Sequence, residues 1–140
     1  MLLLSAGARI AGFDEIPPFA QSNMPRLYAK AKELGAEISG PEVFLYDFLP
    51  EGGINLRIGI PVREAKGDAG PFEFFTAKAL KCASCIYRGS MKGIGQAWDD
   101  LTHHCGDKGY KLTHENREVY LLWKSFDSAE NETELQRGIE

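Results

Sequence analysis

Two segments of the chain place a carboxylate at the start of a strand-like run that contains aromatic residues. The segments are Glu42-Val43-Phe44-Leu45-Tyr46 and Glu118-Val119-Tyr120-Leu121-Leu122. Because side chains alternate along a strand, each glutamate shares a face with the aromatic residues at even spacing. Aromatic rings offer π faces to flat or cationic molecules, and a carboxylate held among them acts through a low local dielectric. The two segments therefore predict a site for a small cationic or aromatic ligand.

The same residues also have an ordinary structural interpretation. A glutamate at the first residue of a strand is usually solvated, and Phe or Tyr at every second position is usually part of the core. In the second segment the opposite face carries Val119, Leu121 and Trp123. We expect this wholly apolar face to meet the helices.

The pattern recurs because the chain consists of two similar halves. Each glutamate-headed strand follows an amphipathic helical stretch and precedes a segment that ends in Gly-Ile, at Gly59-Ile60 and at Gly138-Ile139. Such duplication predicts an α+β fold of two pseudo-symmetric strand-helix-strand-strand repeats, which form a concave antiparallel sheet with helices on one face. We expect a single domain with repeat one at about 1–63, a linker at about 64–70 and repeat two at about 71–140, and a ligand cleft between the repeats.

Hydrophobic periodicity and helix breakers locate the individual elements. In the first half they predict a strand to about Phe13, a loop over 14–18, a helix from Met24 to Gly35 with Asn23 as N-cap, and a hairpin of strands 42–49 and 54–62. The second half is expected to open at 71–75. It continues with a strand over 78–88, a helix carrying Ile94, Ala97, Trp98, Leu101 and Cys105, and a hairpin of strands 117–124 and 133–139.

Charge and hydropathy narrow the classes of partner. The formal net charge of −4 argues against a nucleic-acid-binding surface. The opening residues Met1 to Leu4 lack the basic region of a secretory signal, and no later run approaches the roughly 20 apolar residues that a membrane span needs. We therefore expect a cytoplasmic protein that binds neither nucleic acid nor membrane, while a protein partner and a homodimer are left open.

The cysteines and histidines are the candidate metal ligands. Cys82 and Cys85 have C-x-x-C spacing, but they fall within a predicted strand, where residues three apart point to opposite faces. His103, His104 and His114 lie at a helix end or in a loop, where solvated histidine is the common role. Ser90 follows Gly89 without a base at recognisable spacing. We expect no metal and no cofactor. Because the chain has three cysteines, an odd number, we also expect no disulfide framework.

Four motifs of the second half stand out together: Ala83-Ser84-Cys85-Ile86-Tyr87-Arg88-Gly89-Ser90-Met91, Gln96-Ala97-Trp98-Asp99-Asp100-Leu101, Arg117-Glu118-Val119-Tyr120-Leu121 and Glu132-Thr133-Glu134-Leu135-Gln136. Through these motifs the second half resembles the GyrI-like family, the effector-binding domain of AraC-type and MerR-type multidrug regulators. The first half matches more faintly. The chain departs from the family pattern at Glu115-Asn116, where Gly-Pro is usual.

This resemblance implies a binding module for small amphipathic molecules that acts as a sensor or a sequestering protein. In the family, the glutamate at the position of Glu118 pairs with lipophilic cations in an aromatic cleft, and the position of Tyr87 lines that cleft. Because the duplicated module occupies these 140 residues, we expect no DNA-binding helix-turn-helix, although the family is associated with transcription regulation. Stand-alone relatives imply an alternative, a small hydrolase of reactive lipophilic compounds that uses Glu118 with Tyr87. The family name implies a third, a protein-binding inhibitor of the gyrase-inhibitor type.

Taken together, the residues and the resemblance predict a set of ligand-binding positions. Glu118 supplies the counter-charge to a cationic or lipophilic ligand. The remaining members of the set are Tyr87, Tyr120, Phe44, Tyr46, Trp123 and Glu42.

Overall fold

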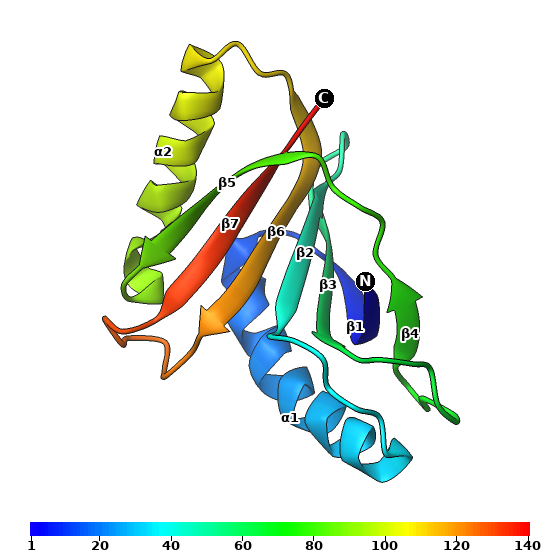
Figure 1. Ribbon diagram of the computed structural model, residues 1–140. Coiled ribbons are helices and arrows are strands. Elements are labelled where there is room, and N and C mark those ends of the chain that lie inside the picture. Colours follow the sequence, from blue (N-terminus) through cyan, green and yellow to red (C-terminus); the bar gives the residue numbers. More distant parts are fainter. The chain divides into compact units, whose positions relative to one another are not determined.

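The computed structural model describes residues 1–140 and divides into two compact units, Met1–Ala79 and Leu80–Glu140. The first unit contains β1 (Leu2–Ile10), α1 (Ile16–Leu34), β2 (Val43–Phe48), β3 (Ile54–Pro61) and β4 (Glu73–Thr76). The second unit contains β5 (Cys82–Arg88), α2 (Ile94–Asp107), β6 (Leu112–Leu122) and β7 (Glu132–Ile139). Each unit thus has a long helix beside its strands, and both units can be followed in Figure 1. The predicted α+β fold with antiparallel strands is confirmed.

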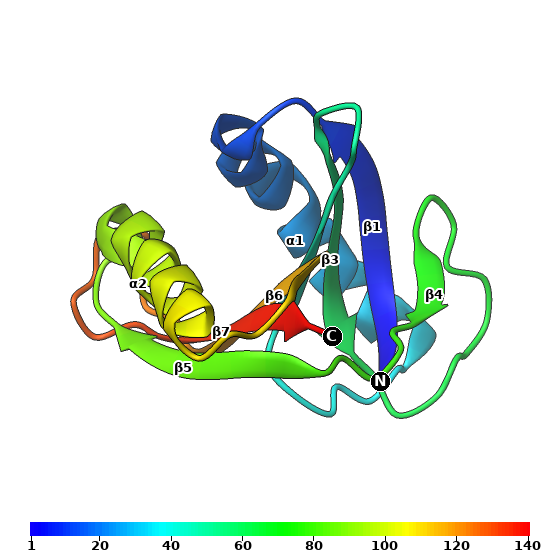
Figure 2. The ribbon, with the colours of Figure 1, turned by 90° about the horizontal axis from the view of Figure 1, so that it is seen from above.

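The sheet of the first unit has the strand order β4-β1-β3-β2, and every pair is antiparallel. Its core is made of fully buried aliphatic side chains, among them Leu3, Leu4, Ile58 and Ile60. Helix α1 packs on β1 and β3 (Figure 2), and it buries Met24, Leu27 and Ala31. The hairpin of β2 and β3 agrees with the alternation of apolar residues from Ile54 onward.

Helix α1 begins at Ile16, well before the predicted start at Met24. The segment predicted to be a loop contains two prolines, but a proline in the first helical turn costs no hydrogen bond and its φ suits a helix. Asn23 is therefore not an N-cap; its Nδ2 donates to the Phe19 carbonyl inside the helix at 2.9 Å. The predicted stop is correct, because Gly35 adopts the left-handed conformation (φ 65°) that caps a helix C-terminus.

Strand β4 corrects the expected start of the second half. The segment 71–75 is expected to open repeat two, yet β4 pairs with β1 in the register Leu3–Phe75 and Ser5–Glu73. The Ser5 hydroxyl also donates to the Glu73 carbonyl at 3.0 Å. The sequence does not reveal β4 as a partner of β1, because strand pairing over such a long stretch of chain leaves no local signal.

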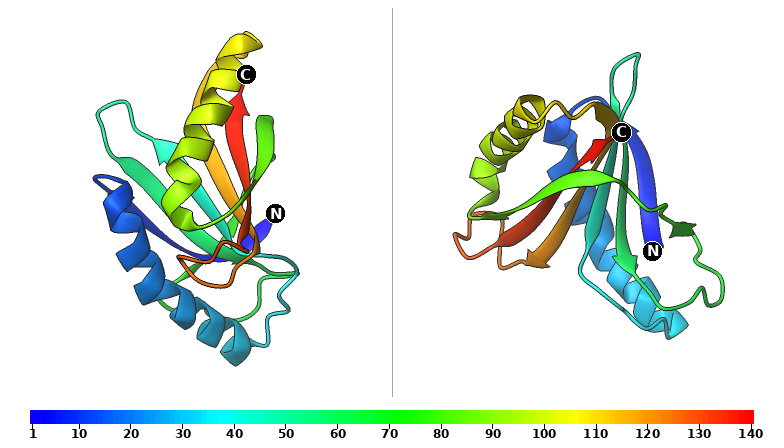
Figure 3. Two further views of the ribbon diagram at one scale, coloured as in Figure 1. Left: turned by 90° about the vertical axis from the view of Figure 1, so that its left-hand side faces the viewer. Right: turned by 45° about the horizontal axis from the view of Figure 1, so that its top comes forward.

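The sheet of the second unit has the order β6-β7-β5, again antiparallel. Helix α2 packs on β5 and β7 (Figure 3), and the predicted apolar stripe is the face that does so. Leu101 and Cys105 of this stripe form a cluster with Leu135, against which Ala97 and Trp98 also pack. Three predicted boundaries are wrong: β5 begins at Cys82 rather than Lys78, and β6 runs from Leu112 to Leu122 rather than over 117–124.

Candidate functional site

The register of β6, β7 and β5 aligns the candidate residues of the second unit in two rows. Glu118 pairs with Leu135, and Leu135 pairs with Cys85. In the next row Tyr120 pairs with Thr133, and Thr133 pairs with Tyr87. Directly paired residues of antiparallel strands point to the same face, so both rows share the face on which Leu135 packs against α2.

The Glu118 carboxylate is buried on this face and held by two aromatic donors. Glu118 is only 5% exposed. Trp98 Nε1, from α2, donates to Glu118 Oε2 at 2.7 Å, and the Tyr120 hydroxyl donates to Oε1 at 2.5 Å. The two donors, an indole N–H and a phenol, fix the orientation of the carboxylate.

The contact between Trp98 and Glu118 overturns the predicted orientation of β6. The face of Val119, Leu121 and Trp123 is expected to meet the helices, yet α2 lies on the face of Glu118 and Tyr120. Leu121 is 46% exposed, whereas Tyr120 is 8% exposed. The alternation predicted for β6 is correct, but α2 covers the face of Glu118, whose carboxylate accepts from the Trp98 indole N–H.

Tyr120 connects the carboxylate to a second ring. Its ring makes an edge-to-face contact with Trp123 at 5.8 Å between centroids. Trp123 follows the last residue of β6 and is about half exposed, so strand alternation does not apply to it. The three residues Glu118, Tyr120 and Trp123 thus run from a buried charge to an exposed aromatic surface.

Tyr87 lies on the same face as Glu118, but its hydroxyl is engaged elsewhere. The hydroxyl donates to the Ser90 carbonyl at 2.7 Å, in the turn between β5 and α2. This turn depends on glycine, because a Cβ at Gly93 would overlap the Tyr87 hydroxyl. The ring packs against the cluster of Leu101, Cys105 and Leu135. The aromatic hydroxyl that contacts Glu118 is that of Tyr120.

The candidate residues of the first unit lie at the start of β2. Phe44 and Tyr46 are buried and share a face of the strand. Glu42 precedes β2 and accepts a hydrogen bond from the Tyr28 hydroxyl of α1 at 2.7 Å. Burial and this carboxylate together raise the pKa of Tyr28 well above its usual value. Glu42 therefore also contacts an aromatic donor from the preceding helix, although Tyr28 is 40% exposed.

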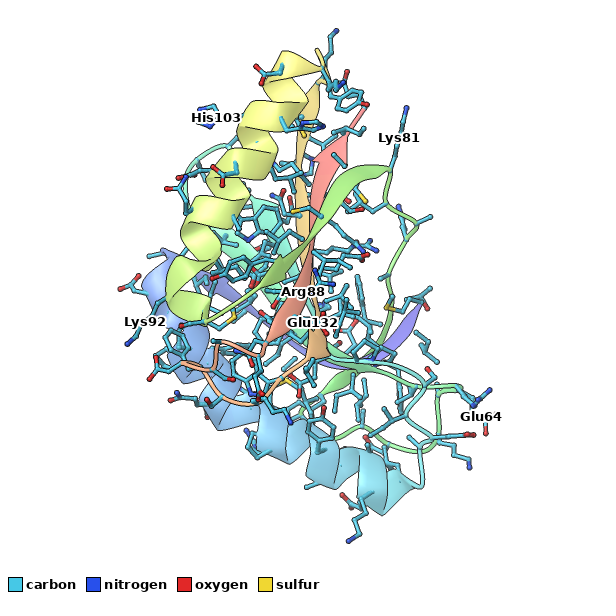
Figure 4. All side chains as sticks on the ribbon, turned by 60° about the vertical axis from the view of Figure 1, so that its left-hand side comes forward. Glu64, Lys81, Arg88, Lys92, His103 and Glu132 are labelled. Atoms are coloured by element: carbon cyan, nitrogen blue, oxygen red, sulfur yellow. The ribbon has the colours of Figure 1, made fainter.

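The cysteines and histidines are dispersed. Cys85 lies in the row of Glu118, while Cys82 is an odd number of residues away and points to the opposite face. Burial raises the pKa of both thiols. All three histidines are exposed, and His103 projects outward from α2 in Figure 4. No group of three or more His, Cys, Asp or Glu side chains is placed to hold a metal ion.

None of the helices is long and apolar enough to span a membrane.

Trp98 is the site residue that the sequence does not reveal. The sequence pattern places it in the apolar stripe of α2, where its ring does pack. The available signal is chemical: a buried indole N–H usually finds an acceptor, and Glu118 is the carboxylate on the aromatic strand that follows this helix.

No family model matches the sequence, and no curated protein matches it. Solved structures do share the fold. The C-terminal domain of EcmrR has a TM-score of 0.79 at 22% identity, covering 99% of this chain and 90% of that one. SAV2435, solved bound to tetraphenylphosphonium, has a TM-score of 0.70 at 13% identity, covering 100% and 88%. A hydrolase from Listeria innocua has a TM-score of 0.62 at 12% identity, covering 100% and 87%. These likenesses, at 12–22% identity, show that the chain has the same fold as these proteins.

Proposed function

We propose that the second unit binds a small amphipathic molecule with its positive charge beside Glu118, and that the protein acts as a sensor or sequestering module. The observation that carries this proposal is the buried Glu118 carboxylate held by Trp98 and Tyr120. Tyr120 and Trp123 supply ring surfaces for the apolar part of the ligand.

A cation is favoured over a neutral ligand for an electrostatic reason. Removing a carboxylate from water costs free energy, and a positive charge brought beside it in a low dielectric recovers more than it would in water. Rings around the carboxylate add cation–π attraction to the same charge. The fold neighbour SAV2435 was solved with tetraphenylphosphonium, which is a lipophilic cation of this kind.

The test uses two ions of nearly the same shape and opposite charge. We expect tetraphenylphosphonium to show saturable binding in isothermal titration calorimetry and tetraphenylborate to show none. Equal binding of both ions would mean that the interaction is merely hydrophobic and would remove the electrostatic part of the proposal. Absence of binding by tetraphenylphosphonium and by a fluorescent cationic dye would remove the proposal altogether.

Hydrolysis of a reactive lipophilic compound is a second candidate. The observation in its favour is the Tyr120 hydroxyl beside Glu118, because a carboxylate paired with a hydroxyl can serve general acid–base chemistry. A fold neighbour from Listeria innocua is described as a hydrolase. Mass spectrometry of strained-ring substrates incubated with the protein separates the two functions. Turnover that is lost in Tyr120→Phe while tetraphenylphosphonium still binds would favour the enzyme.

A further inference from the structure

A second polar row lies beside Glu118 on the face that α2 covers. Asn116 of β6 pairs directly with Arg137 of β7. Arg137 Nη1 donates to Asn116 Oδ1 at 2.5 Å, so the two side chains lie on one face. Asn116 is two residues before Glu118, and Arg137 is two residues after Leu135, which places this row on the same face as the carboxylate.

This row contains buried donors that no protein group satisfies. Asn116 Nδ2 and Arg137 Nε are both buried and lack a hydrogen-bond partner. Asn116 itself is 4% exposed. Buried polar atoms are normally hydrogen-bonded, and two neighbouring exceptions in one row need an explanation. Since both atoms are N–H donors, the group that would satisfy them is an acceptor.

The third buried side-chain atom without a partner lies on the same face. Thr133 Oγ1 is in the row of Tyr120, on the other side of Glu118 from Asn116. Thr133 is fully buried. All three unpartnered atoms therefore flank Glu118, and none lies in the first unit.

The Glu118 row and the Asn116–Arg137 row differ in charge, and this difference defines a class of ligand. Glu118 presents negative charge, while the Asn116–Arg137 row presents a guanidinium and N–H donors. The two β6 positions are about 6.6 Å apart, because a strand rises about 3.3 Å per residue. A ligand with a positive centre at one end and an oxygen acceptor at this distance would complement both rows.

Building on the function proposed above, we propose that the ligand is an organic cation that carries a hydrogen-bond-accepting oxygen, such as a carbonyl. Its charged centre lies beside Glu118, and its oxygen accepts from Asn116 Nδ2 and Arg137 Nε. The acceptor distinguishes it from a purely hydrocarbon cation.

The proposal is tested with two derivatives of tetraphenylphosphonium that differ in one group. One ring carries an acetyl group or an ethyl group in the para position, which places the carbonyl oxygen at a distance from phosphorus similar to the spacing of the two rows. We expect the acetyl compound to bind the protein about tenfold more tightly, the gain expected of one hydrogen bond to a buried charged or polar donor. Equal affinities with both cations bound would overturn this inference and leave the proposed function standing, whereas no binding of either would overturn both.

Substitution of Asn116 tests whether this residue causes the preference for the acetyl compound. Asn116→Asp keeps the acceptor for Arg137 and removes the Nδ2 donor, so the acetyl-to-ethyl affinity ratio should fall toward one. The added negative charge affects both cations equally and cancels in the ratio. Asn55→Asp, the same change at an exposed strand position of the first unit, should leave the ratio unchanged. A wild-type ratio that persists in Asn116→Asp would place the acceptor elsewhere and refute the assignment.

Discussion

The substitution Glu118→Gln removes the charge of the site with little change of shape. The introduced amide oxygen would still accept a hydrogen bond from Trp98 Nε1. The amide N–H would donate to the Tyr120 hydroxyl, which both donates and accepts. We therefore expect the fold to survive, with a loss of about 1 kcal/mol in the free energy of unfolding because bonds to an ionised acceptor become bonds to a neutral one.

The effect on ligand binding should be larger than the effect on stability. A unit positive charge about 5 Å from the carboxylate gains roughly 3 kcal/mol at an effective dielectric of about 20, and less where water reaches the ligand. Loss of this interaction predicts a decrease in tetraphenylphosphonium affinity by about ten- to a hundredfold, or about 1–3 kcal/mol. Isothermal titration calorimetry measures the affinity, and thermal unfolding measures the stability.

The matched control is Glu42→Gln, because Glu42 also heads a strand and accepts from an aromatic hydroxyl of the preceding helix. It should change the affinity less than Glu118→Gln does. An unchanged affinity in Glu118→Gln would refute the reasoning, and a larger effect at Glu42 would mean that the ligand binds the first unit. Unfolding of Glu118→Gln would show that the carboxylate is structural.

Three further changes follow from the second unit. Gly93→Ala should lower the free energy of unfolding by about 1–3 kcal/mol, because the new Cβ would displace the Tyr87 hydroxyl from the Ser90 carbonyl. In a Tyr87→Phe background Gly93→Ala should cost much less, and a double-mutant cycle in which the two costs simply add would show that Gly93 and the Tyr87 hydroxyl are not in close contact. Thr133→Val removes a buried hydroxyl without a partner at nearly constant volume, so thermal unfolding should show a gain of roughly 1 kcal/mol, and a loss would mean that the hydroxyl is satisfied. Protein purified without added zinc should be free of metal by elemental analysis because Cys82 and Cys85 point to opposite faces; stoichiometric zinc would contradict the strand geometry.

Much of the fold follows from local patterns because each pattern has a single physical cause. The stripe from Ile94 to Cys105 has helical spacing, and those residues are the ones that pack on β5 and β7. The predicted start of α1 is wrong because Pro17 and Pro18 suggest a loop, although a helix accepts proline in its first turn. Strand β4 is predicted in the wrong half because its partner β1 lies at the start of the chain, and only the folded structure brings the two together.

The sequence predicts which residue types form the candidate site and which of them share a strand face. It predicts less well which side chains contact one another. Alternation along β6 correctly puts Glu118 and Tyr120 on one face. Which face the helix covers does not follow from alternation, since Val119 and Leu121 are the more apolar pair. The answer depends on Trp98, whose indole provides both apolar surface and a donor for the carboxylate. The unpartnered atoms in the neighbouring rows depend on side-chain packing and leave no trace in the sequence pattern.

A sheet normally packs its apolar face against a helix. In the second unit the face that α2 covers also carries buried polar residues, and these need an explanation other than packing. Leu135 follows the rule and joins the core cluster. Glu118, Asn116 and Thr133 occupy buried positions on the same face, where each lowers stability relative to an apolar residue that would pack there. The ligand proposed above would account for these buried polar residues together, because it would accept from the unpartnered donors beside Glu118, whereas packing alone favours their replacement by apolar residues. The same reasoning predicts that stabilising substitutions on this face will weaken binding, and Thr133→Val tested for both properties is the simplest case.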